Sequence, residues 1–564
     1  MSARKKKERS VARGDLQAQN PFVRLFRSLI RPTVPRFRRT LDTATITPLK
    51  LPEIGTTITP LKLPEIRTTI GRFLGRSDLV QCLYVCRAWY ASFLPLVWST
   101  VSILRSKGRY PEVEAFNSHN HLIRKLEYDF WAWRAYKSTH CRNVSTLRVR
   151  CEYSVHVVIA QYDQLRQLSI IGTRTSEYGN TRWEPTNSFR NLSSLELEMV
   201  DIKGSTNNFW NLCTGLESLS IHRMNIPHLP DKSIIFERLE KLKLWPLSGD
   251  VCKRRVEFIT QCPNLVSLDW GRAVGDEPAS VASVDMFASQ LAKGTWPRLC
   301  ELRIPSSISS DKQLAQIVHG MRQVKSLDVQ GCWFGPLTLT AFRQHFSGLR
   351  QLKLEYTGHT EIGPSNVHEV LASCPQLEIL IAGEVTSEEL LQDQSWACEH
   401  TLKTLHMCII LSPCEDMDRH QQLVLEKISR CSHLEDFGLL LSAPSRDATY
   451  INATLGKGLE HLANLKKLRR LGLNSCSNRM TKADVEWILD NLKNLECVRG
   501  FLDNMSLSAM IRAKGIQFDT AEKCWVALTL KAPCDNRNPD DPIPPTEALA
   551  DNHNWKAGLD GLIS

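Results

Sequence analysis

The feature that most constrains this chain is a recurring L-x-x-L-x-L pattern whose second anchor returns about every 27 residues. The pattern continues for most of the chain, and two positions after each anchor another apolar residue usually follows. Alternation of this kind is typical of a short strand with one buried face. The fifteen second anchors are Leu126, Leu147, Leu168, Leu195, Leu219, Leu242, Leu268, Leu302, Leu327, Leu352, Leu380, Leu405, Phe437, Leu471 and Val498.

Amphipathic helical patterns lie between many of these strands, for example at 312–321, 366–373, 421–430 and 483–492. A strand and a helix repeated about fifteen times predict a curved α/β solenoid with parallel strands on its concave face and helices on its convex face. The pattern resembles leucine-rich repeats and covers about two thirds of the chain, from about 120 to 503, within a repeat domain placed at 110–530. Irregular spacing predicts inserted loops near 270–295, 410–430 and 440–465.

The segment before the repeats has helical periodicity of its own. Ile66, Ile70, Phe73 and Leu74 share one helical face, and a second helix is predicted to carry Leu79, Leu83, Cys86 and Tyr90 on one stripe. Both helices have more apolar surface than a helical hairpin covers by itself. The segment is therefore predicted to bury one face within the chain and another against a partner.

The order of these residues resembles the F-box, the module that binds the Skp-type adaptor of cullin-containing ubiquitin ligases. The resemblance covers residues 63–101, within a helical module predicted at 63–103, and departs by one residue after Pro64 and one between Trp89 and Pro95. It implies no catalytic residues and no cofactor, but a Skp-type adaptor and a cullin as partners. The alternative is a plain helical cap on the repeat array. The positions that match the motif are Leu63, Pro64, Ile66, Ile70, Phe73, Leu74, Leu79, Leu83, Val85, Cys86, Trp89, Pro95 and Trp98.

The concave sheet face is predicted to hold a protein substrate, although an ordinary solvated sheet face is equally compatible with the pattern. The residues that would face the substrate are Arg148, Glu196, Lys243, Asp269, Arg303, Asp328, Lys353 and His406. Their mixed charges argue against a nucleic-acid groove, which would be uniformly basic. Trp245 and Trp333 follow strand ends and are candidate anchors at the rim.

The 18 cysteines show no Cys-x-x-Cys pair, so we expect no metal site. Seven of them recur at set places in the repeat pattern and are predicted to be buried thiols: Cys141, Cys213, Cys262, Cys374 and Cys431 before the anchors, and Cys332 and Cys476 after the strands. The Walker-type phosphate loop and the common hydrolase motifs are also missing from the sequence, and we expect no enzymatic activity. Neither a secretory signal nor a membrane-spanning run is evident, which predicts a cytoplasmic or nuclear protein with reduced thiols.

Both ends of the chain are predicted to be largely disordered. The first 44 residues hold twelve Lys and Arg against three acidic residues, out of a net charge of +11 for the whole chain. This basic tail at 1–62 includes a tandem duplication of twelve residues and is compatible with a nuclear import signal, a mitochondrial presequence or a plain solvated tail. Residues 535–564 are rich in Pro, Asp and Asn.

The predicted function is therefore that of a substrate-recognition subunit of a ubiquitin ligase of the SCF type. Two alternatives remain at this point. One is an interaction scaffold of the same fold that works outside any ligase. The other is a regulator of a partner GTPase, which would need an exposed arginine on a loop at a strand end.

Overall fold

The computed structural model describes residues 63–520 apart from short internal gaps. The gaps are 105–109, 130–132, 137–138, 152–161, 173–180, 184–188, 203–205, 226–227, 246, 249–253, 272–280, 305–307, 309, 355–364, 393, 415, 441–448, 474–479 and 501–504. The predicted tails at 1–62 and 535–564, including the duplicated segment, lie outside the described residues.

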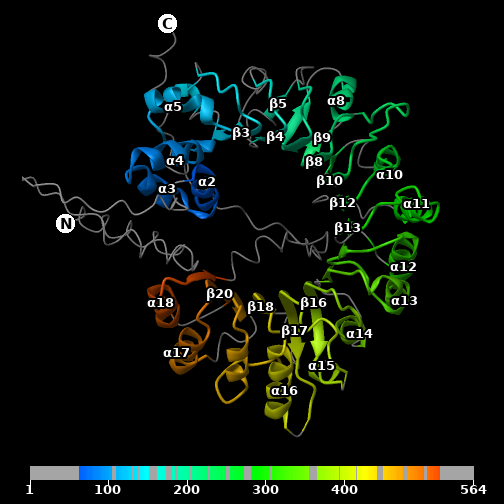
Figure 1. Ribbon diagram of the computed structural model, residues 1–564. Coiled ribbons are helices and arrows are strands. Elements are labelled where there is room, and N and C mark those ends of the chain that lie inside the picture. The colour runs from blue at the N-terminus through cyan, green and yellow to red at the C-terminus, as the bar shows by residue number, and fades with distance from the viewer. Residues whose placement is uncertain are drawn as a thin grey trace, which may run out of the picture. The chain divides into compact units, whose positions relative to one another are not determined.

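Seventeen described strands form one parallel sheet, in which each strand pairs with the next one along the repeat array (Figure 1). The strands are β1 Thr100–Ile103, β2 Lys125–Asp129, β3 Thr146–Cys151, β4 Gln167–Gly172, β6 Ser194–Glu198, β8 Ser218–His222, β10 Lys241–Leu244, β12 Ser267–Trp270, β13 Glu301–Arg303, β14 Ser326–Asp328, β15 Gln351–Lys353, β16 Ile379–Thr386, β17 Thr404–Ile410, β18 Asp436–Leu439, β19 Arg470–Leu473, β20 Cys497–Gly500 and β21 Gln517–Thr520. Two small sheets join β5 Thr181–Trp183 to β7 Val200–Ile202, and β9 Met224–Asn225 to β11 Leu247–Ser248.

Helices lie on the outer side of the curved sheet, and the strands line its inner side (Figure 1). The longer helices are α5 Val113–His119, α8 Thr206–Cys213, α10 Arg255–Thr260, α11 Val281–Ala292, α12 Asp311–Gly320, α13 Pro336–Phe342, α14 Ser365–Ser373, α16 Met417–Ser429, α17 Lys482–Asn491 and α18 Met505–Ala513. Shorter turns are η4 Asn120–Leu122, η5 Arg134–Tyr136, η6 Arg343–His345, α15 Ser387–Leu390 and η7 Leu459–Asn464. This is the curved α/β solenoid that the sequence predicts.

The repeat anchors align in one continuous register across the sheet. All fifteen predicted anchors are neighbours of one another in consecutive strands, and each is at most 2% exposed. Val101 extends this row by one strand at the beginning and Phe518 by one at the end. The two terminal strands were not predicted, because their segments lack the full L-x-x-L-x-L pattern.

Three other expectations are wrong. The segment near 270–295 was expected to be an inserted loop, but residues 281–292 form α11, whose Phe287 and Leu291 are buried in the core. Most of the loop expected near 410–430 is likewise a helix, α16. The second helix of the N-terminal segment is divided in two, since α3 (Arg76–Leu83) ends before Cys86 and α4 (Arg87–Ser99) begins after it. Leu79, Leu83, Cys86 and Tyr90 therefore do not share one helical stripe.

Candidate protein-binding surfaces

Three helices precede the sheet and form a small module, α2 (Pro64–Phe73), α3 and α4. Pro64 occupies the first turn of α2, where its missing N–H costs no hydrogen bond. Four buried residues make the module's core: Leu79 and Cys82 of α3 with Phe93 and Val97 of α4. This core is small for three helices, so much of the module's apolar surface remains outside it.

The residues that match the F-box pattern fall into three groups. Leu79 is buried in the module's own core. Six are half-buried: Ile66, Ile70, Leu74, Leu83, Trp89 and Trp98, of which the last four pack against that core. Six are exposed: Leu63, Pro64, Phe73, Val85, Cys86 and Pro95.

Trp89 packs within the module against Phe93. Its indole meets Phe93 in an edge-on arrangement, with ring centroids 5.3 Å apart and planes at 72°. The ring is nevertheless only half-buried. Trp89 therefore belongs to both the module's interior and its surface, a position that the sequence left open.

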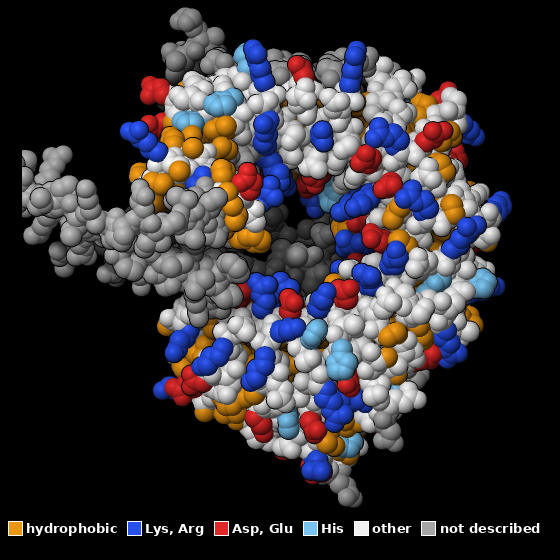
Figure 2. Space-filling view, in the orientation of Figure 1, with side chains coloured by type: hydrophobic (Ala, Val, Ile, Leu, Met, Phe, Trp, Pro, Cys, Tyr) orange, Lys and Arg blue, Asp and Glu red, His pale blue; other side chains and the backbone are white. Residues whose placement is uncertain are grey.

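Large apolar side chains are unusually exposed on this module. Phe73 is 69% exposed, Tyr84 81%, Val85 50% and Tyr90 45%. Figure 2 shows hydrophobic side chains gathered over α2–α4. Scattered apolar residues are common on protein surfaces, but several on one small module indicate an interaction site. Tyr84 was not singled out from the sequence, although it lies between Leu83 and Val85, which were.

The module continues into the sheet without a linker, because α4 ends at Ser99 and β1 begins at Thr100. The Ser99 carbonyl accepts a hydrogen bond from the Arg124 backbone N–H at 3.0 Å. Trp98 packs against the module core and the solenoid core at once. Trp98, a residue of the F-box pattern, therefore connects the α2–α4 module to the solenoid.

The eight residues predicted on the concave face lie in a single row of the sheet, one position after the anchors. Lys243, Asp269, Arg303, Asp328 and Lys353 occupy this row on five consecutive strands, β10 to β15. Arg148 and Glu196 lie further along the row on β3 and β6, and His406 lies on β17. Lys and Arg side chains alternate with Asp and Glu along this inner face (Figure 2).

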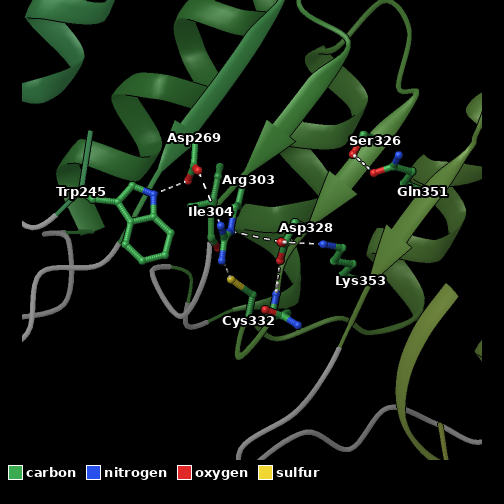
Figure 3. A network of polar contacts seen from close by, with 10 residues as sticks. Trp245, Asp269, Arg303, Ile304, Ser326, Asp328, Cys332, Gln351 and Lys353 are labelled. Atoms are coloured by element: carbon green, nitrogen blue, oxygen red, sulfur yellow. Dashed lines mark hydrogen bonds and ion pairs between the residues drawn. The ribbon is translucent and has the colours of Figure 1, made fainter. Parts of the chain in front are cut away.

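Four of these eight residues join in one ion-pair network, which Figure 3 shows from close by. The Arg303 guanidinium lies between two carboxylates, 3.6 Å from Asp269 and 3.1 Å from Asp328. The Lys353 ammonium lies 3.9 Å from the same oxygen of Asp328. Both carboxylates are largely buried, whereas both cations are about one third exposed.

Trp245 is held inside this network and is not a free anchor at the rim. Its indole N–H donates to Asp269 at 2.7 Å (Figure 3). One ring contact is with His222, stacked at 5.0 Å, and another is with Arg303, whose Cζ lies 4.6 Å from the ring centroid. The cation–π contact with Trp245 and the ion pairs with Asp269 and Asp328 together hold the Arg303 side chain in place.

Burial shifts the pKa of two side chains in this region, Asp269 and His222. Burial raises the pKa of Asp269 despite the opposing charge of Arg303 and the hydrogen bond from Trp245. Burial also lowers the pKa of His222, more than the nearby carboxylate of Glu198 raises it. Burial therefore disfavours the charged form of Asp269, and the contacts with Arg303 and Trp245 offset part of this cost.

A second cluster lies on the inner face of β17 to β20. Asp436 accepts a hydrogen bond from His406 Nε2 at 2.9 Å on one carboxylate oxygen, and its other oxygen is 2.7 Å from Arg470 Nε. Burial by itself would raise the pKa of Asp436, but the His406 hydrogen bond and the charges of His406, Arg470 and Arg499 lower it overall. Asp436 and Arg470 were not predicted, because they precede the anchors while the prediction used only the position after them.

The cysteines that precede the anchors are buried, as predicted. Cys141, Cys213, Cys262, Cys374 and Cys431 are each at most 1% exposed, and burial raises the pKa of their thiols. Cys332 is buried as well, whereas Cys476 lies outside the described residues. Over the described ranges, no group of three or more His, Cys, Asp and Glu side chains is arranged to hold a metal ion. No helix among those described is both long and apolar enough to cross a membrane.

Comparisons with known proteins add little beyond the fold. No protein-family model matches the chain, and no curated protein matches it. Several solved structures resemble it. A leucine-rich-repeat protein of Leptospira interrogans, LIC12759, is 15% identical with a TM-score of 0.29, over 73% of this chain and 99% of that one.

Two further solved structures show the same level of similarity. The plant peptide hormone receptor RGFR1, in complex with RGF2, is 15% identical with a TM-score of 0.32, over 67% of this chain and 55% of that one. The internalin InlF of Listeria monocytogenes is 14% identical with a TM-score of 0.25, over 67% and 80%. Because these TM-scores are low, the leucine-rich-repeat assignment rests on the strand register and helix placement described above.

Proposed function

We propose that this chain is a non-enzymatic substrate receptor of a ubiquitin ligase of the SCF type. In this proposal the α2–α4 module docks to the Skp-type adaptor and, through it, to a cullin. The inner face of the sheet holds a protein substrate. The chain then contributes proximity, by placing the substrate near the subunits that transfer ubiquitin.

The observation that carries the proposal is the exposed apolar surface of the module. Phe73, Tyr84, Val85 and Tyr90 are between 45% and 81% exposed on a segment of fewer than forty residues. A module that only capped the solenoid would bury its apolar surface against the first repeat, as Trp98 does. The F-box resemblance supports a Skp-type adaptor as the partner that covers this surface.

The direct joint between module and sheet is also consistent with this role. Trp98 belongs to both hydrophobic cores, and β1 follows α4 at once. A substrate on the sheet would therefore keep a defined position relative to a ligase that is attached to the module. A flexible tether would allow many orientations and lower the effective concentration of the substrate.

Co-purification with a Skp-type adaptor and cullin tests the proposal. We expect the wild-type chain to capture both, and Phe73→Glu to reduce the capture at least tenfold, because a charge would be placed in the centre of an apolar contact. Leu337→Glu is the matched control, since Leu337 is 56% exposed on α13, outside the module. It should capture the adaptor as wild type does.

The same measurement includes the outcomes that reject the proposal. If the folded wild-type chain captured neither adaptor nor cullin, the chain would be an interaction scaffold outside the ligase. Trp89→Ala should also weaken capture, by both loss of contact area and loosening of α4. Equal recovery with Phe73→Glu, Trp89→Ala and wild type would mean that the adaptor binds elsewhere.

A further inference from the structure

We propose that one edge of the last repeats binds an acidic, extended segment of a partner protein through four lysines, Lys466, Lys467, Lys493 and Lys514, which form the basic edge. They lie in the turns that lead from η7, α17 and α18 into the strands β19, β20 and β21. The proposal does not depend on the ligase role, and it adds a second interaction surface to the chain.

The strand register brings the four lysines together. The strands β19, β20 and β21 begin in register with one another. Lys466 and Lys493 each lie four residues before their strand, and Lys467 and Lys514 each lie three residues before theirs. The Asn494 side-chain amide donates to the Lys466 carbonyl oxygen at 2.7 Å, so the first two turns are in direct contact. Because paired strands are about 4.8 Å apart, the lysines form a short row.

The charges of the basic edge are exposed and are not balanced within the described chain. All four lysine side chains are exposed, and in the described ranges their ammonium groups form no ion pair and no hydrogen bond. The nearby carboxylates act on Arg469 instead. Arg469 donates to both oxygens of Glu496 at 2.8 Å, and the charge of Glu435 also acts on it. The four ammonium groups therefore remain available to an anion.

This concentration of charge distinguishes the last turns from other turns of the array. Residues 464–470, 491–496 and 512–515 contain seven Lys and Arg in all and a single acidic residue. The equivalent turns before β12 and β16, at 261–266 and 373–378, contain no Lys or Arg. A positive potential is therefore built up at the end of the solenoid, where it attracts acidic partners.

The chemistry of the basic edge favours an acidic peptide over a nucleic acid. Single-stranded nucleic acids bind through aromatic side chains on which bases stack, in addition to charge. Among the described residues, the exposed large apolar and aromatic side chains all lie at or before Met417, outside the last repeats. The basic edge thus offers charge without a stacking platform. An extended segment of six residues is about 20 Å long, enough to contact all three turns.

Chemical cross-linking of a peptide to the full chain tests the site. The probe is hexaglutamate with both ends blocked, joined to lysines by a zero-length carbodiimide and located by mass spectrometry. We expect cross-links at the basic edge to exceed those at three reference lysines about tenfold. The reference lysines, exposed residues of separate repeats, are Lys125, Lys232 and Lys312. Salt at about 1 M should remove the excess, because exposed charges are screened.

Two triple variants of equal charge separate the site from net charge. In the first, Lys466→Gln, Lys467→Gln and Lys493→Gln are combined, and cross-linking at Lys514 should fall about fivefold because the neighbouring charges that hold the probe are gone. In the second, the three reference lysines are replaced by glutamine, and Lys514 should react as in wild type. The basic N-terminal segment is the same in both variants, so it does not contribute to the difference.

Each outcome decides the inference. Equal cross-linking of the basic edge and the reference lysines would show that no site exists, as would an unchanged yield at Lys514 in the first variant. Oligothymidylate of six nucleotides is the competitor. If it removed the Lys514 cross-link at a lower concentration than unlabelled hexaglutamate did, the ligand would be a nucleic acid and the protein assignment would be wrong. Adaptor capture through the α2–α4 module is measured separately, so either proposal can fail while the other stands.

Discussion

The imidazole of His119 lies flat on the indole of Trp98, with ring centroids 4.8 Å apart and planes 7° from parallel. His119 ends α5, the first helix of the repeat array, and its Nδ1 lies 2.8 Å from the Ala115 carbonyl oxygen. Trp98 lies in the last turn of α4, in the module. The stack therefore connects the two parts through side chains, beside the direct backbone connection at β1.

We expect Trp98→Ala to destabilise the module much more than the repeats. Truncating a packed tryptophan costs about 3 kcal/mol, and here the loss falls on the contact that ties α2–α4 to the sheet. Hydrogen exchange followed by mass spectrometry should show faster exchange at 64–99, with residues of β16 to β19 unchanged.

Trp487→Ala is the control for that prediction. Trp487 is a partly buried tryptophan of α17 that packs on the solenoid core alone. Its variant should accelerate exchange near α17 and leave the module protected. If Trp98→Ala increased the rate of hydrogen exchange equally over the whole chain, Trp98 would be an ordinary core residue.

Asp328→Asn should lower the free energy of unfolding by about 2 kcal/mol, measured by urea denaturation. The substitution removes the charge that lies 3.1 Å from Arg303 and leaves a partly buried cation poorly compensated. The value is below that of a fully buried pair because Arg303 is 36% exposed. Glu426→Gln removes a surface ion pair between a residue of α16 and Arg430, which directly follows the helix, and should change the free energy of unfolding by at most about 0.5 kcal/mol. Equal effects of both would contradict the special role of the inner network.

The stability contributions of two of the buried aspartates, Asp436 and Asp269, should change with pH in opposite directions. The pKa of Asp436 is lowered by folding, so its contribution to stability is present above about pH 4, where an unfolded aspartate ionises, and is lost as pH falls through the folded pKa. The pKa of Asp269 is raised, so its contribution is present below about pH 4 and is lost as pH rises through the folded pKa.

Urea unfolding from pH 3 to pH 7 checks both signs. Relative to wild type, Asp436→Asn should become more destabilising as pH rises, and Asp269→Asn should become less so. If the two variants followed wild type in parallel at every pH, neither carboxylate would titrate differently in the folded and unfolded chain.

Gly438→Ala should be destabilising although the residue lies in a regular strand. The added Cβ would meet the His406 ring at 2.9 Å, so the imidazole would have to leave Asp436 or the strand would have to shift. Overpacking of this kind costs about 1–3 kcal/mol by chemical denaturation. Gly215→Ala, where no atom lies within 4 Å of the new Cβ, should be close to neutral. If Gly438→Ala left the free energy of unfolding unchanged, the His406 side chain would have to adopt another rotamer without cost.

The repeat architecture could be predicted from sequence because it depends on local periodicity. An apolar residue at every second position specifies a strand with one buried face, and its return about every 27 residues specifies stacking. All fifteen predicted anchors, from Leu126 to Val498, lie in register for this reason. The eight inner-face residues follow from the same alternation, since the position after a buried anchor must face the other way.

Pairing between side chains could not be predicted, because it depends on contacts across strands. Arg303 pairs with residues 34 positions before it and 25 after it, and nothing local distinguishes it from Arg148. The division of the second module helix at Cys86 and the joint at Trp98 also depend on packing against distant residues. Sequence alone therefore determined the solenoid and which residues line its inner face, whereas only the tertiary structure decided which of those charges pair with one another within the chain.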